Sequence, residues 1–480
     1  MPPPPSEVSS IEDQAEVPRW SEGGGSCSGA GAATCDCPAQ GRPWLTAFDG
    51  VAVRGADAPG RNDAPPAPYR PRMPERPVDT DSQTSSTGVP VTADNTRAVP
   101  RLQLAMTRAM GTPFFEGNRV TRIKNGEDIF AAMLGAINGS TLSVDLSAFI
   151  FWQSDITETF ISALCDAARR GVAVRVLADG WGGHFVGDHM PGMLREAGAQ
   201  FSWFRPLAVK KGRNNFYRSH RRVLAVDNSI AFTGGVGFAD HWTGDAEGWD
   251  RWRDSHFQVE GPAVEGLRAG FEEHWVEEEQ EDFSNLLDRP TPMPAGPASL
   301  QVIRADTALH WNDIATAYQA LVRSAQSRLW ISTAYFTPDP LLIKLLKDAD
   351  ARGVDVRVMI PSLAQNDKWL ATIAAEDSIT AFAGTGVRFF RYQPTMLHAK
   401  GMVIDDRGSV FGSANFNHRS MMTDDELIVV AVDDELNATL AADFEQDLQD
   451  CEEASPEDYA HPNLKKKLGR LLTRWKTSQV

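Results

Sequence analysis

The sequence predicts an α/β protein made of two duplicated α/β sandwich lobes that pack with pseudo-twofold symmetry, preceded by a disordered arm. Three observations predict this architecture. A short polar motif occurs twice, a strand-helix-strand pattern occurs twice around it, and the N-terminal segment shows no periodic spacing of apolar residues. The chain has 480 residues, 42% of them hydrophobic, so it is long enough to bury a large core.

The strand-helix-strand pattern is carried by matching segments in the two halves of the chain. In each half, apolar segments with strand character enclose a segment with helical spacing. Each helical segment ends close to a glycine, Gly171 or Gly353, as helices before a parallel strand often do. The strand, helix and strand segments are 140–151, 156–169 and 170–177 in the first half, and 327–336, 340–351 and 352–359 in the second.

The repeated motif places a histidine, a cation and an aspartate at fixed spacing. The histidine and the cation stand two residues apart at the head of an apolar run, so on a β-strand both side chains point to the same face. The apolar runs that we expect to be buried are 223–226 and 402–404. The two copies are His220, Arg222 and Asp227 in the first half, and His398, Lys400 and Asp405 in the second.

A neutral imidazole beside a fixed cation suits attack on an anionic phosphodiester. The cation neutralises phosphate oxygens, and the imidazole acts as the nucleophile or the proton donor. A single histidine in a strand is more often a structural residue than a catalyst. Here the spacing recurs, and each copy is followed by a turn of small residues and then by an acid, which favours catalysis. These residues are 234–237 with Asp254, and 412–415 with Glu426.

On these motifs the chain resembles the phospholipase D superfamily, and within it the bacterial cardiolipin synthase type. The resemblance covers residues from about 115 to about 450 and includes the stretches 232–237, 252–254 and 260–264. It implies that the two lobes face each other, so that both histidines form one site and a monomer is sufficient for a complete site.

The resemblance also implies a role for each histidine and each acid. His220 is expected to take the phosphoryl group as a covalent phosphohistidine, and His398 is expected to protonate the leaving group. Asp254 is expected to orient His220, and Glu426 is expected to orient His398. Because a carboxylate on one ring nitrogen favours the charged imidazole, such acids can separate the pKa values of the two histidines.

No metal and no other cofactor is expected, because Arg222 and Lys400 supply the positive charge that a bound ion supplies in other phosphoryl-transfer sites. Groups that bind the substrate are expected in the two small-residue turns, as side-chain donors in one turn and backbone amides in the other. They are Ser413 and Asn415 in the second turn, and Gly235 and Gly237 in the first.

Two features of the first copy depart from the pattern of the family. Gly237 stands where relatives commonly have Asn, and Arg222 replaces the usual Lys, so a partly impaired site is an alternative to an active one. Arginine retains the charge but presents a broad fork in place of a compact ammonium. Asp227 and Asp405 end the two motifs, and for them a structural or supporting role is expected.

Five parts are expected along the chain. Residues 1–105 form a disordered arm, 106–289 the first lobe, 290–298 a proline-rich linker, 299–455 the second lobe and 456–480 a basic amphipathic tail. The arm has neither the basic start nor the apolar core of a signal peptide, and no segment approaches the length of a membrane-spanning helix. A cytoplasmic protein, peripherally associated with the inner face of the cell membrane, is therefore expected.

The charge distribution favours an anionic phospholipid surface over nucleic acid as the partner. The net charge of −17 disfavours a general nucleic-acid binder. Residues 462–480 place leucines and a tryptophan at helical spacing among cations, which is typical of a helix on an anionic bilayer; docking on its own protein is the alternative. A cationic cluster beside the first motif suits capture of a headgroup, with a solvated loop as the alternative. Its members are Lys210, Lys211, Arg213, Arg218, Arg221 and Arg222.

Three enzymatic functions remain open from the sequence. The favoured one is a phosphatidyl transferase of the cardiolipin synthase type, which passes a phosphatidyl group from a histidine to a lipid alcohol. The second is a phospholipase D that passes the same group to water, and the third is a phosphodiesterase or nuclease on the same fold. A protein that only binds is poorly supported while both histidines are present.

Overall fold

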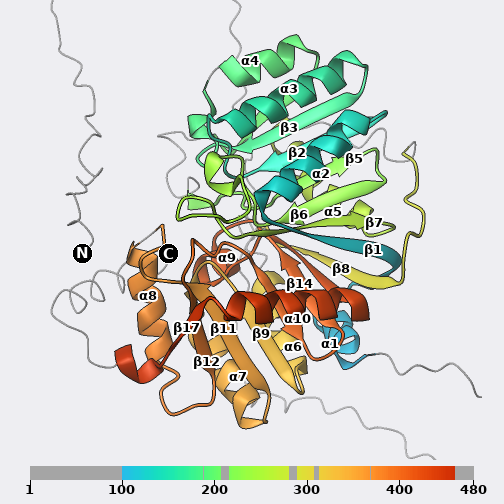
Figure 1. The fold of residues 1–480 in the computed structure, drawn as a ribbon. Helices are drawn as coiled ribbons and strands as arrows, with labels where there is room; N and C mark the ends of the chain where they lie inside the picture. The colour runs from blue at the N-terminus through green and yellow to red at the C-terminus, as the bar shows by residue number, and fades with distance from the viewer. Residues whose placement is uncertain are drawn as a thin grey trace, which may run out of the picture. The chain divides into compact units, whose positions relative to one another are not determined.

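The structure is a computed structural model that describes residues 100–187, 189–206, 216–279, 289–306, 313–367 and 369–459. Most of the expected arm, the expected tail from residue 460 onward, and Lys210, Lys211 and Arg213 lie outside these residues. The described residues form two lobes, coloured cyan to yellow-green and yellow to red in Figure 1.

The first lobe, in its described residues, contains seven strands and four α-helices. Its strands are β1 (Phe115–Lys124), β2 (Ser143–Ala148), β3 (Ala173–Asp179), β4 (Gln200–Phe204), β5 (Val223–Val226), β6 (Ile230–Gly234) and β7 (Ser255–Glu260). Its helices are α2 (Asn125–Gly139), α3 (Asp155–Arg169), α4 (His189–Glu196) and α5 (Val264–Glu279), with 3-10 turns η1 (His184–Val186) and η3 (Asp240–Trp242) in the loops.

The second lobe continues the chain from the linker. Its described strands are β8 (Ala298–Arg304), β9 (Arg328–Ser332), β10 (Phe336–Thr337), β11 (Asp355–Pro361), β12 (Arg388–Tyr392), β13 (Gly401–Ile404), β14 (Gly408–Gly412), β15 (Phe416–Asn417), β16 (Leu427–Val432) and β17 (Cys451–Ala454). Its helices are α6 (Asp313–Ser324), α7 (Pro340–Ala351), α8 (Trp369–Thr380), α9 (His418–Met422) and α10 (Asp434–Leu448), with the 3-10 turn η5 (Pro456–Tyr459) at the end.

One continuous sheet joins the lobes. Across the described residues it has fifteen strands in the order β17-β12-β11-β9-β13-β14-β16-β8-β1-β7-β6-β5-β2-β3-β4 (Figure 1). The strands β1 and β8 pair antiparallel, with Phe115 opposite Leu300 and Asn118 opposite Ala298. Outward from this pair, β7-β6-β5-β2-β3-β4 repeats the order β16-β14-β13-β9-β11-β12. The duplicated α/β architecture expected from the sequence is therefore confirmed, and the two copies meet at one seam.

Local sequence explains the two βαβ units. Ser154 accepts a hydrogen bond from the Thr157 amide at the start of α3, and Asp339 accepts one from the Leu342 amide at the start of α7. Both helices are followed by a glycine with a left-handed backbone, which glycine adopts without a steric penalty. The strands that flank each helix are parallel, β2 with β3 and β9 with β11.

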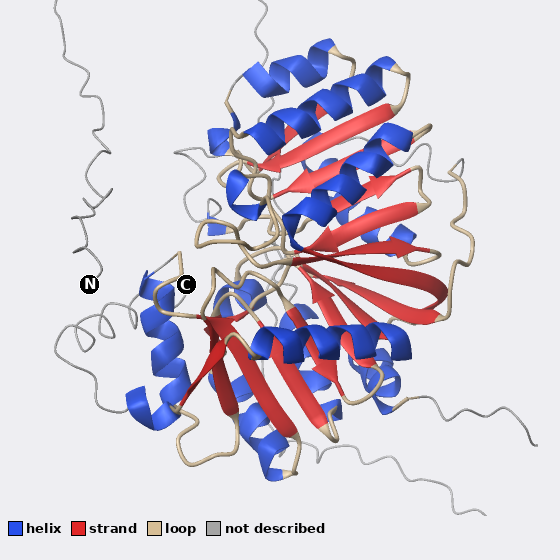
Figure 2. Ribbon diagram, in the orientation of Figure 1, coloured by secondary structure: helices blue, strands red, loops and turns tan. Residues whose placement is uncertain are grey.

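Helices cover both faces of the sheet (Figure 2). On β5, Leu224 and Val226 pack into the core beneath α2, α3 and α4, while Val223 and Ala225 face the core that contains α5. The side chains of β13 alternate in the same way between two cores. The prediction that both apolar runs after the motifs are buried is confirmed.

Helix α1 (Arg101–Met110) differs from the expected organisation in two respects. It begins inside the range 1–105 that we expected to be disordered. It also precedes the first lobe in the sequence but packs in the core of the second lobe, where Leu102 and Met106 are buried with residues of α6. The amphipathic pattern is short, and burial of these two side chains against the second lobe stabilises a helix that would be marginal alone.

The aspartates that end the motifs fix turns at the ends of β5 and β13. Asp227 accepts hydrogen bonds from the amides of Thr141, Leu142 and Ser143. Asp405 accepts hydrogen bonds from the amides of residues 326–328 in the equivalent place. Strand β5 lies between Asp227 and His220, so these carboxylates support the sheet at the end away from the histidines.

Replacing Asp227 or Asp405 by Ala is expected to lower the free energy of unfolding by about 2 kcal/mol, because several amides lose a charged acceptor. Burial opposes ionisation of Asp227, but the amide hydrogen bonds prevail and lower its pKa. Its stabilisation is therefore present above about pH 4 and is lost as the pH falls toward the folded-state value. Urea denaturation across this pH range measures the effect. Asp406→Ala is the control, because the Asp406 side chain is 91% exposed; an equal effect of Asp406→Ala would contradict the assignment.

Candidate active site

Both histidines lie where parallel strands end. His220 precedes β5, which pairs with β2 so that Val223 faces Ser147. His398 precedes β13, which pairs with β9 so that Gly401 faces Ser332. Each histidine and its cation stand in an extended segment just before the strand, not within it as expected. Extended backbone still places alternate side chains on one side, and so each histidine lies beside its own cation.

Two short parallel bridges between the lobes bring the histidines together. The His220 amide donates to the Asp425 carbonyl at 2.9 Å, and the Asp425 amide donates to the Arg218 carbonyl at 2.8 Å. The His398 amide donates to the Arg253 carbonyl at 2.8 Å, and the Arg253 amide donates to the Met396 carbonyl at 3.0 Å. The first bridge therefore places His220 next to Glu426, which follows Asp425, and the second places His398 next to Asp254, which follows Arg253.

Each histidine is held by the acid of the opposite lobe. Nδ1 of His220 lies 2.9 Å from Oε1 of Glu426, and Nδ1 of His398 lies 2.7 Å from Oδ2 of Asp254. The expected pairing of Asp254 with His220 and of Glu426 with His398 was therefore wrong. Asp254 and Glu426 directly precede β7 and β16, the strands next to β1 and β8 in the sheet. The two bridges direct each acid across the interface, toward the histidine of the other lobe and not toward the histidine of its own lobe.

The two acids are fixed by different donors. The Ser413 hydroxyl donates to Oε2 of Glu426 and itself accepts from the Leu427 amide at 3.0 Å. Asp254 accepts from the indole Nε1 of Trp242 at 3.0 Å and from the Ser255 amide at 2.8 Å. Ser413 was expected to bind a phosphate oxygen, whereas in the structure its hydroxyl forms hydrogen bonds with the Glu426 carboxylate and the Leu427 carbonyl.

The first turn is shaped by close packing. A Cβ on Gly235 would lie 2.2 Å from a carboxylate oxygen of Asp254, so only glycine lets the acid approach this closely. The Gly235 amide donates to the Ser255 carbonyl at 3.3 Å. A Cβ on Gly237 would lie 2.8 Å from Ile150, so the Asn of relatives does not fit here without rearrangement. Asn415, the equivalent residue of the second turn, is buried, and its side-chain Oδ1 has no hydrogen-bond partner within the described structure.

The two motif cations lie against their histidines. Nη2 of Arg222 lies 3.0 Å from Nε2 of His220, and Nζ of Lys400 lies 3.1 Å from Nε2 of His398. Both cations are buried, and burial lowers their pKa values. For Lys400 the pKa falls to about 7, because burial and the charge of Arg222 outweigh the attraction of Asp254.

The electrostatic environments of the two acids differ. Burial raises the pKa of Glu426 to about 7, and the hydrogen bond from Ser413 and the charge of Arg222 only partly oppose this. Burial also acts on Asp254, but His398 and Lys400 prevail and lower its pKa. Burial and the charge of Lys400 lower the pKa of His398 to about 3, against the attraction of Asp254. The pKa values of the two acids are therefore shifted in opposite directions, that of Asp254 downward and that of Glu426 upward.

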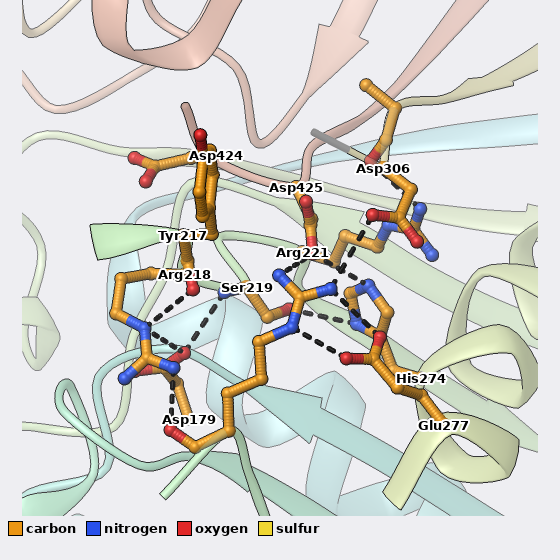
Figure 3. A network of polar contacts seen from close by, with 12 residues as sticks. Asp179, Tyr217, Arg218, Ser219, Arg221, His274, Glu277, Asp306, Asp424 and Asp425 are labelled. Atoms are coloured by element: carbon orange, nitrogen blue, oxygen red, sulfur yellow. Dashed lines mark hydrogen bonds and ion pairs between the residues drawn. The ribbon is translucent and has the colours of Figure 1, made fainter. Parts of the chain in front are cut away.

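A polar network anchors the segment that carries His220 (Figure 3). Asp179 at the end of β3 accepts from the Ser219 amide at 3.0 Å, and the Ser219 hydroxyl lies 3.2 Å from Nδ1 of His274. Nε2 of His274 lies 3.3 Å from Oδ2 of Asp425, which also pairs with Arg205 at 2.8 Å. This network joins α5 of the first lobe to the residue that precedes Glu426 in the second.

The structure shows that the prediction of a cationic cluster for headgroup capture around the first motif was wrong for Arg218 and Arg221. Arg218 donates to the Arg205 carbonyl at 2.6 Å, and Arg221 donates to the Gly270 carbonyl at 2.8 Å. Both side chains are fully buried, so they neither form a solvated loop nor face a headgroup. Among the described members of the cluster, only Arg222 lies beside one of the two motif histidines, because the extended backbone turns Arg221 to the opposite side.

The second bridge has a matching anchor with opposite charges. Arg253 precedes Asp254 as Asp425 precedes Glu426, and Arg253 pairs with Asp447 of α10 at 2.8 Å. Asp447 also contacts Lys124 at 3.3 Å. At each bridge, therefore, the residue before the acid forms an ion pair with the other lobe, and a long helix, α5 or α10, supplies a partner.

Aromatic side chains complete the surroundings of the histidines and were not identified from the sequence. Trp242 and Trp252 each lie 5.2 Å from the ring of His398, and Phe149 lies 5.0 Å from the ring of His220 in an edge contact. Trp252 stands two residues before the predicted site residue Asp254, and this spacing was the one sequence signal that could have identified it as a neighbour of a histidine. Nothing in the sequence spacing of Trp242 or Phe149 marks them as neighbours of the two motif histidines.

The described residues contain no group of three or more His, Cys, Asp or Glu side chains arranged to hold a metal ion. Within the same residues, no helix has the length and apolar character needed to cross a membrane.

Two lobes that each bring one histidine-cation motif to a shared site define a phospholipase D-type protein. The sequence profile described as "Cardiolipin synthase, PLD-like domain" matches residues 133–275 and 318–448. The chain belongs to this family.

Named relatives agree with this membership. The chain is 31% identical to "Cardiolipin synthase A" of Pseudomonas fluorescens over 393 residues, 80% of each chain. It is 32% identical to "Cardiolipin synthase A" of Pseudomonas aeruginosa over 377 residues, 77% of this chain and 75% of the relative. The crystal structure of phosphatidylserine synthase from Haemophilus influenzae Rd KW20 has a similar fold, with a TM-score of 0.60 at 14% identity, over 79% of this chain and 98% of that one.

The different environments of Asp254 and Glu426 predict different effects of pH on stability. Because the folded-state pKa of Glu426 is raised to about 7, ionising it costs the folded protein stability as the pH rises from about 4.3. Glu426→Gln is expected to remove this loss, which is up to about 3 kcal/mol, when urea denaturation at about pH 5 and about pH 8 is compared. Asp254→Asn is the matched control. The pKa of Asp254 is lowered, so the ionised carboxylate stabilises the folded protein above about pH 4. The Asp254→Asn variant is expected to lose this contribution equally at both pH values. Equal pH profiles for the two variants would contradict the asymmetry.

Proposed function

We propose that the chain is a phosphatidyl transferase of the cardiolipin synthase type, acting on phospholipid phosphodiesters through a phosphohistidine intermediate. The observation that carries this proposal is the pair of buried histidines, each beside a cation and each hydrogen-bonded to an acid of the opposite lobe. Membership of the cardiolipin synthase family and the names of the relatives support a phospholipid substrate.

In the first step, Nε2 of His220 bonds to phosphorus as the bond from phosphorus to the leaving alcohol oxygen breaks. The Glu426 carboxylate holds Nδ1, so the ring presents Nε2 to the reacting group. His398 gives its proton to the leaving oxygen. In the second step, an acceptor hydroxyl attacks phosphorus, His398 takes the hydroxyl proton, and the bond between phosphorus and His220 breaks.

The charges at the site support this division of roles. Asp254 is ionised beside His398, so it stabilises a protonated imidazole at that position. In the protein alone, burial and Lys400 keep the pKa of His398 low. The negative charge of a bound phosphodiester raises the pKa values of both His398 and Lys400. Substrate binding therefore favours the protonated state that the leaving group needs.

Arg222 and Lys400 stabilise the charge on the phosphoryl oxygens in this mechanism. Nη2 of Arg222 lies 3.0 Å from Nε2 of His220, the nitrogen that bonds to phosphorus, and Nζ of Lys400 lies 3.1 Å from Nε2 of His398, the residue that exchanges a proton with the alcohol oxygen. Arg222 is buried and donates to the His220 carbonyl at 2.9 Å, so its fork is held in one orientation. This arrangement supports an active first motif despite the departure from Lys.

The acceptor decides between transfer and hydrolysis, and phospholipase D activity is the second candidate. It is favoured wherever water reaches the phosphohistidine before a lipid alcohol does. We further propose that anionic phospholipids and the membrane surface are the partners, and that the protein acts peripherally at the inner face of the cell membrane. The basic residues 462–480 suit such a surface, but they lie outside the described residues.

Purified protein mixed with vesicles that contain phosphatidylglycerol is expected to produce cardiolipin or a related diphosphatidyl lipid. The reason is that a phosphohistidine at a bilayer meets lipid alcohols at high local concentration. Lipid mass spectrometry detects the product, and added EDTA is expected to leave its formation intact. Phosphatidic acid alone would identify a phospholipase. The absence of both lipids, with efficient cleavage of single-stranded DNA, would identify a nuclease.

His220→Ala and His398→Ala are each expected to lower turnover by at least about a thousandfold, because the two side chains act as one unit. The double variant is expected to be hardly slower than either single variant. Protein denatured in alkaline detergent after incubation with phosphorus-labelled phospholipid is expected to carry the label on His220, because the bond between phosphorus and a histidine nitrogen survives base but is hydrolysed in acid. Circular dichroism of each variant establishes that the fold is retained. Turnover near the wild-type rate in a folded single variant would rule out the two-histidine mechanism.

A further inference from the structure

We propose that exposed apolar side chains in the loops at the end of the sheet where the two histidines lie form a docking surface for a phospholipid bilayer. This surface, called the apolar rim below, deepens the proposed function and rests on it. It does not involve the basic tail. The rim consists of Trp181, Phe185, Phe216, Trp249, Leu363 and Met422, all of which are exposed.

The topology places half of the rim at the end of the sheet where the histidines lie. Strands β2, β3 and β4 are parallel, and His220 lies beside their carboxyl ends. Trp181 and Phe185 occupy the loop that follows β3. Strands β9, β11 and β12 are parallel in the second lobe, with His398 beside their carboxyl ends, and Leu363 follows β11. Loops from both lobes therefore contribute to the rim.

Hydrogen bonds place the other half of the rim beside the segments that carry the two histidines. The carbonyl of Trp249 accepts from the Thr395 hydroxyl at 3.3 Å, three residues before His398. The carbonyl of Phe216 accepts from Arg419 at 3.4 Å, and Phe216 precedes His220 by only four residues. Arg419 belongs to α9, which ends with the exposed Met422.

An aromatic path leads from the rim into the site. Phe185 is 66% exposed and lies 6.2 Å from Trp152, between ring centroids. Trp152 lies 6.4 Å from His241, and His241 stacks on Trp252 at 5.3 Å. Trp252 lies 5.2 Å from His398. A bilayer in contact with Phe185 would therefore lie at the end of a continuous aromatic wall that reaches the catalytic histidine.

The composition of the rim favours a bilayer as its occupant. Trp249 is 75% exposed and Trp181 is 56% exposed, and large aromatic rings partition to the interface between lipid headgroups and acyl chains. Asp245 and Glu247 are exposed near Trp249, so the rim is not uniformly cationic. Insertion of apolar side chains, which salt does not screen, is therefore the expected mode of binding, in contrast to the salt-sensitive attraction of a basic tail.

The test compares a rim variant with a matched control variant of the full chain. The rim variant carries Trp181→Ala, Phe185→Ala and Trp249→Ala. The control carries Leu142→Ala, Met293→Ala and Leu341→Ala, which alter three exposed apolar side chains of similar exposure. Leu142 lies at the opposite end of the sheet, where its amide donates to Asp227. Circular dichroism establishes that both variants are folded.

Binding to phosphatidylcholine vesicles with and without phosphatidylglycerol is measured by co-sedimentation at low and high salt. At high salt the rim variant is expected to bind about tenfold more weakly than the wild type, because three large apolar side chains no longer insert. The control is expected to bind as the wild type does. Brominated phospholipids are expected to quench tryptophan fluorescence in the wild type, and Trp249→Phe is expected to reduce that quenching.

The outcomes separate the rim from the proposed function. Rim-dependent binding without any lipid product would retain the rim and overturn the transferase. Lipid product with equal vesicle binding by the rim variant and the wild type would overturn the rim, as would binding that disappears entirely at high salt. A rim variant that changes self-association in sedimentation velocity, with vesicle binding unchanged, would assign the surface to a second copy of the chain and also overturn the proposal.

Discussion

The hydrogen bond between each histidine and an acid of the opposite lobe is the interaction on which the site depends. A single lobe contains a histidine, a cation and an acid, but the acid is positioned to serve the other lobe. The seam between β1 and β8 and the two parallel bridges hold the lobes at the spacing that these bonds require. Several buried ionisable groups would be costly separately, and they are tolerated because they neutralise one another in one place.

Small differences between the two copies give this symmetric frame an asymmetric chemistry. Ser413 supports Glu426, whereas its counterpart Gly235 makes room for Asp254, and the indole of Trp242 supplies the missing donor. Burial raises the pKa of Glu426, the acid beside His220, to about 7 despite the hydrogen bond from Ser413, whereas burial of Asp254, the acid beside His398, is outweighed by His398 and Lys400, which lower its pKa. A duplicated fold can therefore place two identical imidazoles in unlike electrostatic environments, which the proposed acid and nucleophile roles require.

The sequence predicted the fold class well because the information was local. Apolar runs such as 223–226, the cap residues of α3 and α7, and the motif spacing each act over a few neighbouring positions. The crossing of the acids was not predictable in this way, because it depends on contacts between residues more than a hundred positions apart. The burial of Arg218 and Arg221 was not predicted from the sequence for a related reason. Charge in a sequence does not reveal which side of an extended segment meets the interior.

Helix α1 has a consequence for the order in which the chain can fold. On the ribosome, Leu102 and Met106 emerge early, but the residues of α6 that cover them are synthesised only after the whole first lobe. The first lobe can form its own hydrophobic core while α1 is still exposed to solvent, because α1 belongs to the core of the second lobe. α1 can therefore dock only after the second lobe has been synthesised and has folded. Its docking then joins the first described residues of the chain to the lobe that is synthesised last.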